Sequence, residues 1–263
     1  MQPRKKYPTP LFGAMLTPAP ELTGLVRYWH LSTGCKILKP GLKMLPDEHM
    51  DIIFDFKSAR GKGSMRLWGI QLGVRLLKMT NPVEFVGIKF VPGSFYSLFG
   101  RPAHLFSGKV LTLKSAIGQN AEYFNGIFAL KTHEARVNFI NSILVMFAKK
   151  RIPMEPKITR ALKNIYIREG KITVDVLAKN AGWSEFWFSE VFKKWVGITP
   201  QQFCKHIKFK HTMRKLQSGH SFTDVISDLD YADQAHFINF FKHYTGLTPK
   251  NFTKKYIEMH SRK

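Results

Sequence analysis

A repeated segment in the C-terminal part of this 263-residue chain constrains its fold more than any other feature. In the segments 174–203 and 222–252, six Phe, Gly, Thr and Pro positions of the first copy recur 49 residues later in the second copy. Chance does not readily produce six identities in one register, so we interpret the segments as two copies of one structural unit. The identical pairs are Phe188 and Phe237, Phe192 and Phe241, Gly197 and Gly246, Thr199 and Thr248, Pro200 and Pro249, and Phe203 and Phe252.

Each copy has the pattern of a helix, a tight turn, a second helix and a Gly-x-Thr-Pro exit. In the first copy Leu177 and Ala178 face inward, and Ser184 is placed to cap the second helix. The small Ala178 lets two helices approach closely, and Gly182 suits a turn with positive φ. The pattern predicts helix-turn-helix units at about 173–195 and 222–245, whose second helices leave one face open to enter a major groove.

A basic amphipathic segment, residues 201–217, joins the two copies and is predicted to be a linker helix. Further basic residues follow each second helix, where they could hold phosphates and fix the helix in the groove. The default interpretation of the linker cations is a solvated face, so only some of them need to contact DNA. The predicted phosphate contacts are Lys193, Lys194, Lys205, Lys208, Lys242 and His243.

The front of the chain has a different character. Segments 51–56 and 84–91 alternate apolar with polar residues between Gly and Pro, which predicts strands. Residues 119–150 have apolar residues at helical spacing and predict one or two helices, which Pro153 and Pro156 end. We therefore predict an α+β protein with a β-rich sensing or dimerisation domain at 1–150, a linker at 151–157, and an all-α DNA-binding domain at 158–263.

The composition favours a polyanionic binding partner but does not identify which one. There are 41 Lys and Arg against 18 Asp and Glu, a net charge of +23, which favours DNA, RNA or an anionic membrane surface. No segment approaches the ~20 apolar residues that cross a bilayer, and the N-terminus is a poor secretory signal. Cys35 and Cys204 have no partners in CxxC spacing, so no disulfide framework or zinc cluster is encoded. We expect a cytoplasmic protein with no membrane partner.

At this point the sequence resembles the AraC/XylS family of bacterial transcription regulators over about residues 157–258. The matching stretches are LAKNAGWS, FSEVFKKWVGITPQQF and DQAHFINFFKHYTGLTPKNF. Residues 24–29, 44–56 and 87–100 look like the N-terminal domain attached to some members. The resemblance implies regulation of transcription, with double-stranded DNA and RNA polymerase as partners. It leaves open a small-molecule effector on the front domain and a homodimer.

The resemblance also implies which residues contact bases. Glu190 can accept a hydrogen bond from cytosine, Asn239 can pair with adenine, and Phe186 could pack on a thymine methyl group. The chain departs from the family where Asp230 replaces a turn glycine and Ile226 an alanine, and in the linker at Lys208 and Thr212. We expect the second unit to pack differently or bind more weakly. The implied base contacts are Phe186, Ser189, Glu190, Ala235, His236 and Asn239.

Enzyme chemistry finds little support. The stretch 60–64 lacks the glycine of a phosphate loop, since Phe56 occupies that position, and the ten histidines form no metal-binding array. Cys204 is predicted to be a buried apolar residue, and the carboxylates of 47–51 to be surface charge. We predict no cofactor, no metal and no catalytic residue. The alternatives are a DNA-binding module fused to a repair-type enzyme or ligand-processing domain, and a purely structural DNA or RNA binder. The front aromatics are predicted to be core more than pocket: Trp29, Phe54, Phe56, Trp68, Phe85 and Phe90.

Overall fold

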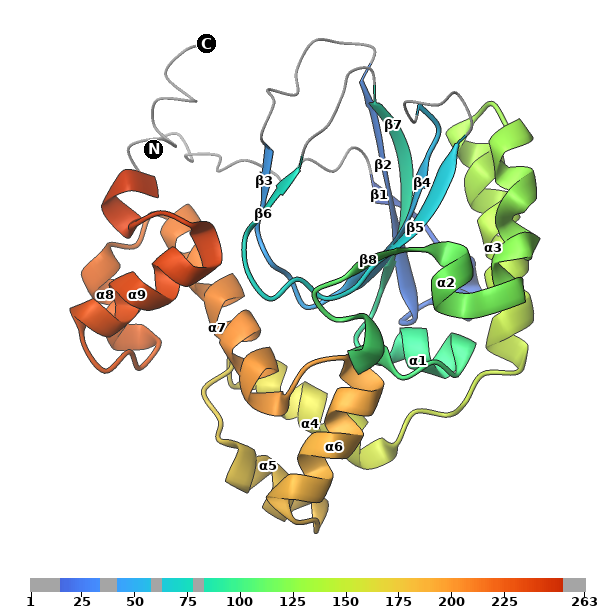
Figure 1. The fold of residues 1–263 in the computed structure, drawn as a ribbon. Helices are drawn as coiled ribbons and strands as arrows, with labels where there is room; N and C mark the ends of the chain where they lie inside the picture. Colours follow the sequence, from blue (N-terminus) through green and yellow to red (C-terminus); the bar gives the residue numbers. More distant parts are fainter. Residues whose placement is uncertain (1–14, 34–41, 58–62, 78–82, 253–263) are drawn as a thin grey trace.

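The structure is a computed structural model that describes residues 15–33, 42–57, 63–77 and 83–252 (Figure 1). The front half is built on a six-stranded antiparallel sheet with the strand order β1-β2-β7-β4-β5-β8, and strands β3 and β6 pair separately. The predicted strands at 51–56 and 84–91 are confirmed. The strands are β1 Met15–Leu16, β2 Val26–Thr33, β3 Leu42–Met44, β4 Met50–Asp55, β5 Ser64–Trp68, β6 Arg75–Leu77, β7 Val83–Phe90 and β8 Val110–Thr112.

The centre of the sheet is held by apolar residues in register. Ile88 of β7 lies opposite Tyr28 of β2 and Ile52 of β4, and all three side chains are fully buried. Phe54 and Phe90 are buried too, which confirms them as core residues; the side chain of Trp29 lies outside the described part. These inward-facing aromatic side chains of the sheet are therefore used in core packing.

Helices cover one face of this sheet, at the right of Figure 1. The predicted helical region 119–150 contains a 3-10 helix, η3 (Gly118–Ala129), before the α-helix α3 (His133–Lys149). Thr132 caps α3 by accepting the backbone N–H of Ala135. Phe124 of η3 packs on Phe54 at 5.8 Å between ring centroids. The other short helices are η1 Pro20–Leu22, α1 Ser94–Phe99, η2 Ala103–Phe106 and α2 Leu113–Ile117.

The C-terminal part is helical throughout its described length, and the predicted fold class is confirmed. Its helices start at side-chain caps readable in the sequence: Thr173, Ser184, Thr199, Ser221 and Asp233 each accept a backbone N–H of the following turn. Among the described residues, no helix is both long and apolar enough to span a membrane. The helices are α4 Pro156–Ile167, α5 Val174–Ala181, α6 Glu185–Val196, α7 Pro200–Gln217, α8 Phe222–Asp228 and α9 Gln234–Thr245.

The hydrophobic core does not stop at the linker. One cluster of buried residues runs from the sheet through α1 and η2 into α4, α5, α6 and the start of α7. Tyr96 of α1 meets Trp195 of α6 edge to face, with ring centroids 4.7 Å apart. A second, smaller cluster joins the rest of α7 to α8 and α9. The first repeat unit is thus packed on the front domain, and the second on the linker helix.

Candidate nucleic-acid interface

The first repeat unit, α5 and α6, is a helix-turn-helix. Gly182 ends α5 with φ +64, and Ser184 starts α6 by accepting the backbone N–H of Trp187 at 3.2 Å. Phe188 and Phe192 are fully buried. The opposite face of α6 begins with Phe186, whose residue surface is 75% exposed. Glu190 is exposed on this side and Ser189 half-exposed, so the predicted base-contact residues of this unit lie together and accessible.

The second unit, α8 and α9, repeats this arrangement with one substitution in its turn. Asp230 takes the left-handed conformation, at φ +51, that Gly182 takes in the first unit. Phe237 and Phe241 are buried, as their counterparts are. Ile226 is half-buried and packs against the small cluster, so the bulky residue is accommodated. The predicted base-contact residues of this unit, Ala235, His236 and Asn239, are all exposed on α9.

Some of the predicted phosphate-contact residues already contact other side chains of the protein, and the others are exposed. Lys193 forms an ion pair with Glu190, so a base contact by the carboxylate and a phosphate contact by the ammonium both require that pair to open. Lys194 lies over the ring of Tyr96 at 5.2 Å. Lys205, Lys242 and His243 are exposed.

Lys208 stabilises the turn of the second unit. Its ammonium group donates to the carbonyl oxygen of Asp230 at 3.0 Å and lies 4.0 Å above the ring of Tyr231. Burial lowers the pKa of Lys208, against the charge of Asp230. Thr212, one turn further along α7, is buried and shares a hydrogen bond of 2.7 Å with the Tyr231 hydroxyl group. The two linker departures from the family pattern therefore hold the turn that carries Asp230, a role that sequence reasoning missed.

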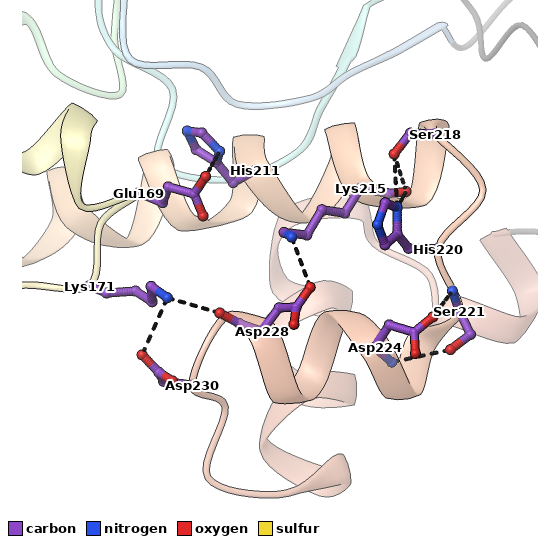
Figure 2. A network of polar contacts seen from close by, with 10 residues as sticks. All are labelled: Glu169, Lys171, His211, Lys215, Ser218, His220, Ser221, Asp224, Asp228 and Asp230. Atoms are coloured by element: carbon purple, nitrogen blue, oxygen red, sulfur yellow. Dashed lines mark hydrogen bonds and ion pairs between the residues drawn. The ribbon is translucent and has the colours of Figure 1, made fainter.

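Polar contacts of α8 and the turn fasten the second unit to its neighbours (Figure 2). Lys215 of α7 pairs with Asp228 of α8 at 2.8 Å, and Lys171 from the α4–α5 loop donates to the Asp228 carbonyl oxygen at 2.9 Å. The hydrogen bond and charge of Lys215 lower the pKa of Asp228. These groups are largely exposed, so each contact stabilises the arrangement only weakly.

A buried polar junction joins the linker helix to the front domain. Glu48 is only 2% exposed and pairs with Lys210 of α7 and, at 3.5 Å, with His49. Burial raises the pKa of Glu48, but His49 and Lys210 outweigh it and bring that pKa below its usual value. His206 of α7 lies 2.9 Å from the carbonyl oxygen of Gln71 and 3.2 Å from the Tyr244 hydroxyl group.

This junction corrects one sequence-based prediction. The carboxylates of 47–51 were expected to be surface charge, but Asp51 and Glu48 are buried. Asp47 and Asp51 both face Lys89, which supplies the compensating charge. No pattern within residues 47–51 indicates their partner on α7, because that partner is 162 residues away in the sequence.

Comparison with known proteins agrees with this geometry. Residues 177–255 match a family described as a helix-turn-helix domain, of the AraC type. Residues 177–255 therefore form an AraC-type helix-turn-helix domain, which supports an AraC-type DNA-binding regulator. Residues 14–112 match a domain of unknown function, DUF6597. No curated protein sequence matches significantly.

Solved structures of ToxT from Vibrio cholerae show limited similarity to this chain. An apo ToxT variant is 10% identical with a TM-score of 0.45, covering 86% of this chain and 96% of ToxT. ToxT bound to a methylnaphthalenyl butenoic acid is 11% identical with a TM-score of 0.44, covering 86% and 97%. ToxT with a bound unsaturated fatty acid is 12% identical with a TM-score of 0.39, covering 87% and 94%. Similarity at this level does not bear on what this chain binds.

The part of the chain that the structure describes holds few other reactive groups. Cys204 is buried as predicted, and burial raises the pKa of its thiol to about 12. Cys35 lies outside the described residues. No group of three or more His, Cys, Asp or Glu side chains suited to a metal occurs in residues 15–33, 42–57, 63–77 and 83–252.

A cavity of about 680 Å³ lies between the front domain and α4. Val91, Pro92 and Gly93 form one side of it, and Leu162 and Tyr166 of α4 form the other. Lys149 and Arg151, from the segment that connects α3 with α4, are also part of its lining.

Proposed function

We propose that this protein regulates transcription by binding specific sequences of double-stranded DNA, with α6 and α9 each placed in a major groove. The observation that carries the proposal is the equivalence of the two helices. Each follows a turn with positive φ and buries two phenylalanines, and each exposes its first three residues and its sixth. A face that stays open in both copies of a repeat is available for a partner, and the width of a helix suits the major groove.

Charge supports DNA as that partner. Lys205, Lys242 and His243 are exposed around the two helices, and the chain carries +23 overall. Cations at such positions bind phosphates and set the register of the recognition helices, and they make binding sensitive to salt. Contacts with RNA polymerase and formation of a homodimer stay predictions.

Selection of bound sequences from random DNA with the intact protein tests the proposal. We expect an enriched motif with two parts, one for each helix, and salt-sensitive binding. Glu190→Ala should relax the preference at one base pair, by about 1–3 kcal/mol of discrimination, and Asn239→Ala should have a smaller effect because the second unit is held less firmly. Equal binding of selected and random DNA would instead favour a structural DNA binder.

We also propose the cavity beside α4 as the effector site. Its volume is within the range of small-molecule sites, about 300–1,000 Å³, and a ligand there would contact both the front domain and α4. Lys149 and Arg151 favour an organic anion with an apolar body. Naphthoate should raise the melting temperature of the protein, and the uncharged naphthalenemethanol should raise it less. Met154→Trp, which fills the cavity, should remove the difference; an unchanged response in that variant would place the ligand elsewhere.

A further inference from the structure

Two exposed aromatic side chains stand next to each other at the start of α6. Phe186 is 75% exposed and Trp187 is 54% exposed. A single exposed apolar side chain is common, but two large adjacent ones mark a surface that gains stability when it is covered. Both belong to the first turn of α6, whose start is held by the hydrogen bond from the Trp187 backbone N–H to Ser184.

The repeat register gives Trp187 a defined place on the reading surface. At the spacing of 49 residues, Phe186 corresponds to Ala235 and Trp187 to His236. His236 is among the predicted base contacts of the second unit, whereas Trp187 was not predicted for the first. In both units this position is the third after the capping residue, Ser184 or Asp233, so Trp187 occupies the place on α6 that His236 occupies on α9.

The chemistry of this turn limits what it can recognise. Residues 185–190 read EFWFSE, without an Arg, Lys, Asn or Gln that could make a bidentate contact with a purine. The polar group nearest the aromatic pair on the outward face, Glu190, is engaged by Lys193. Glu185, which begins the turn, is also exposed, and Phe186 and Trp187 supply the apolar surface between the two carboxylates. In the major groove the apolar feature of a base pair is the C5 methyl group of thymine.

We propose that Phe186 and Trp187 form a thymine-methyl reading surface, and that the DNA bound by the first unit has thymines opposite them. This inference rests on the proposed function. Cations around the turn support a nucleic acid over an apolar protein surface as the partner. Lys157 lies 4.6 Å from the ring centre of Trp183 in this turn, and Lys179 on α5 is exposed, so both can meet phosphates beside the groove.

Replacing thymine by deoxyuridine tests the proposal, because it removes only the methyl group. The intact protein is titrated with its selected DNA site, in which each thymine of the first unit's half is replaced in turn. We expect affinity to fall about fourfold per contacted methyl group, the equivalent of one buried CH₂. Replacing a thymine opposite the pair by 5-methylcytosine, which carries the same methyl group, should retain more affinity than replacing it by cytosine.

The variants Phe186→Ala and Trp187→Ala should bind thymine and deoxyuridine sites equally well. Because both side chains are exposed, both variants should fold, which circular dichroism checks. Tyr123→Ala removes an equally exposed aromatic from the front domain and should keep the full thymine preference. The inference is overturned if the selected site lacks thymine in this half, or if deoxyuridine changes nothing while the site is still bound. Failure to bind any DNA would overturn the proposed function itself.

Discussion

The two helix-turn-helix units share a sequence pattern but are held in place by different means. The first packs through Trp195 and Val196 against the front domain and shares its hydrophobic core. The Ser107 hydroxyl group of the front domain also donates to the Gly197 carbonyl oxygen at 2.6 Å. The second has a small core of its own with α7 and is fastened by ion pairs. A repeat therefore specifies how a unit folds, while its surroundings decide how rigidly it is mounted.

The difference predicts how a change in the front domain would spread. It would reach α6 through buried apolar contacts, which transmit small displacements because they are closely packed. The same change would reach α9 mainly through α7, by way of His206 and Lys210. We expect the first recognition helix to follow the front domain and the second to follow the linker helix.

The largest effects are expected from truncating two equivalent aromatic residues, Trp195 and Tyr244, which are both buried. Trp195→Ala and Tyr244→Ala should each cost about 3–5 kcal/mol of local stability, the usual cost of deleting a large core aromatic. Hydrogen exchange should show lost protection in α1, η2 and α6 for Trp195→Ala. For Tyr244→Ala the loss should be confined to α7, α8 and α9. Loss of sheet protection in Tyr244→Ala would contradict the separate mounting of the second unit.

Two lysines on the linker helix test whether a buried ion pair and a surface ion pair contribute differently to stability. Lys210→Met removes a partner of the buried Glu48, and we expect a loss of about 3 kcal/mol in unfolding free energy, the low end for a broken buried pair, because Lys210 itself is partly exposed. Lys215→Met removes a pair whose carboxylate, Asp228, lies at the surface, and should cost below about 1 kcal/mol. Denaturant titration at neutral pH measures both. Adding Glu48→Gln to Lys210→Met should recover part of the loss; no recovery would mean that Lys210 acts through its packing alone.

Small effects are expected in the two turns. Gly182→Ala places a side chain in open space but at φ +64, so we expect a cost of about 1–2 kcal/mol from backbone strain alone. Asp230→Gly relieves that strain and should stabilise the second unit by up to about 1 kcal/mol. Asp230→Asn is the control, because it tolerates the conformation and loses only the ion pair with Lys171. Thermal unfolding compares the three, and destabilisation by Asp230→Gly would show that the ion pair outweighs the strain.

The local features of the molecule could be predicted from the sequence. The helix start at Ser184, the turn at Gly182 and the buried phenylalanines follow from a cap, a glycine and helical spacing, all of which act within a few residues. The strands at Met50–Asp55 and Val83–Phe90 follow from alternation in the same way. Asp230 stands where the family pattern has a turn glycine, and it takes the left-handed conformation of that position.

The surroundings of these features were decided only by the tertiary structure. Glu48 is buried because Lys210, 162 residues further along, reaches it. Lys208 donates a hydrogen bond to the turn that carries Asp230, whereas the linker pattern suggested a solvated side chain. The prolines near residue 153 end a helix, yet they do not end the hydrophobic core, which continues into α6. Burial and ion pairing depend on distances between chain segments, and a pattern confined to one segment carries no information about the segment that will lie against it.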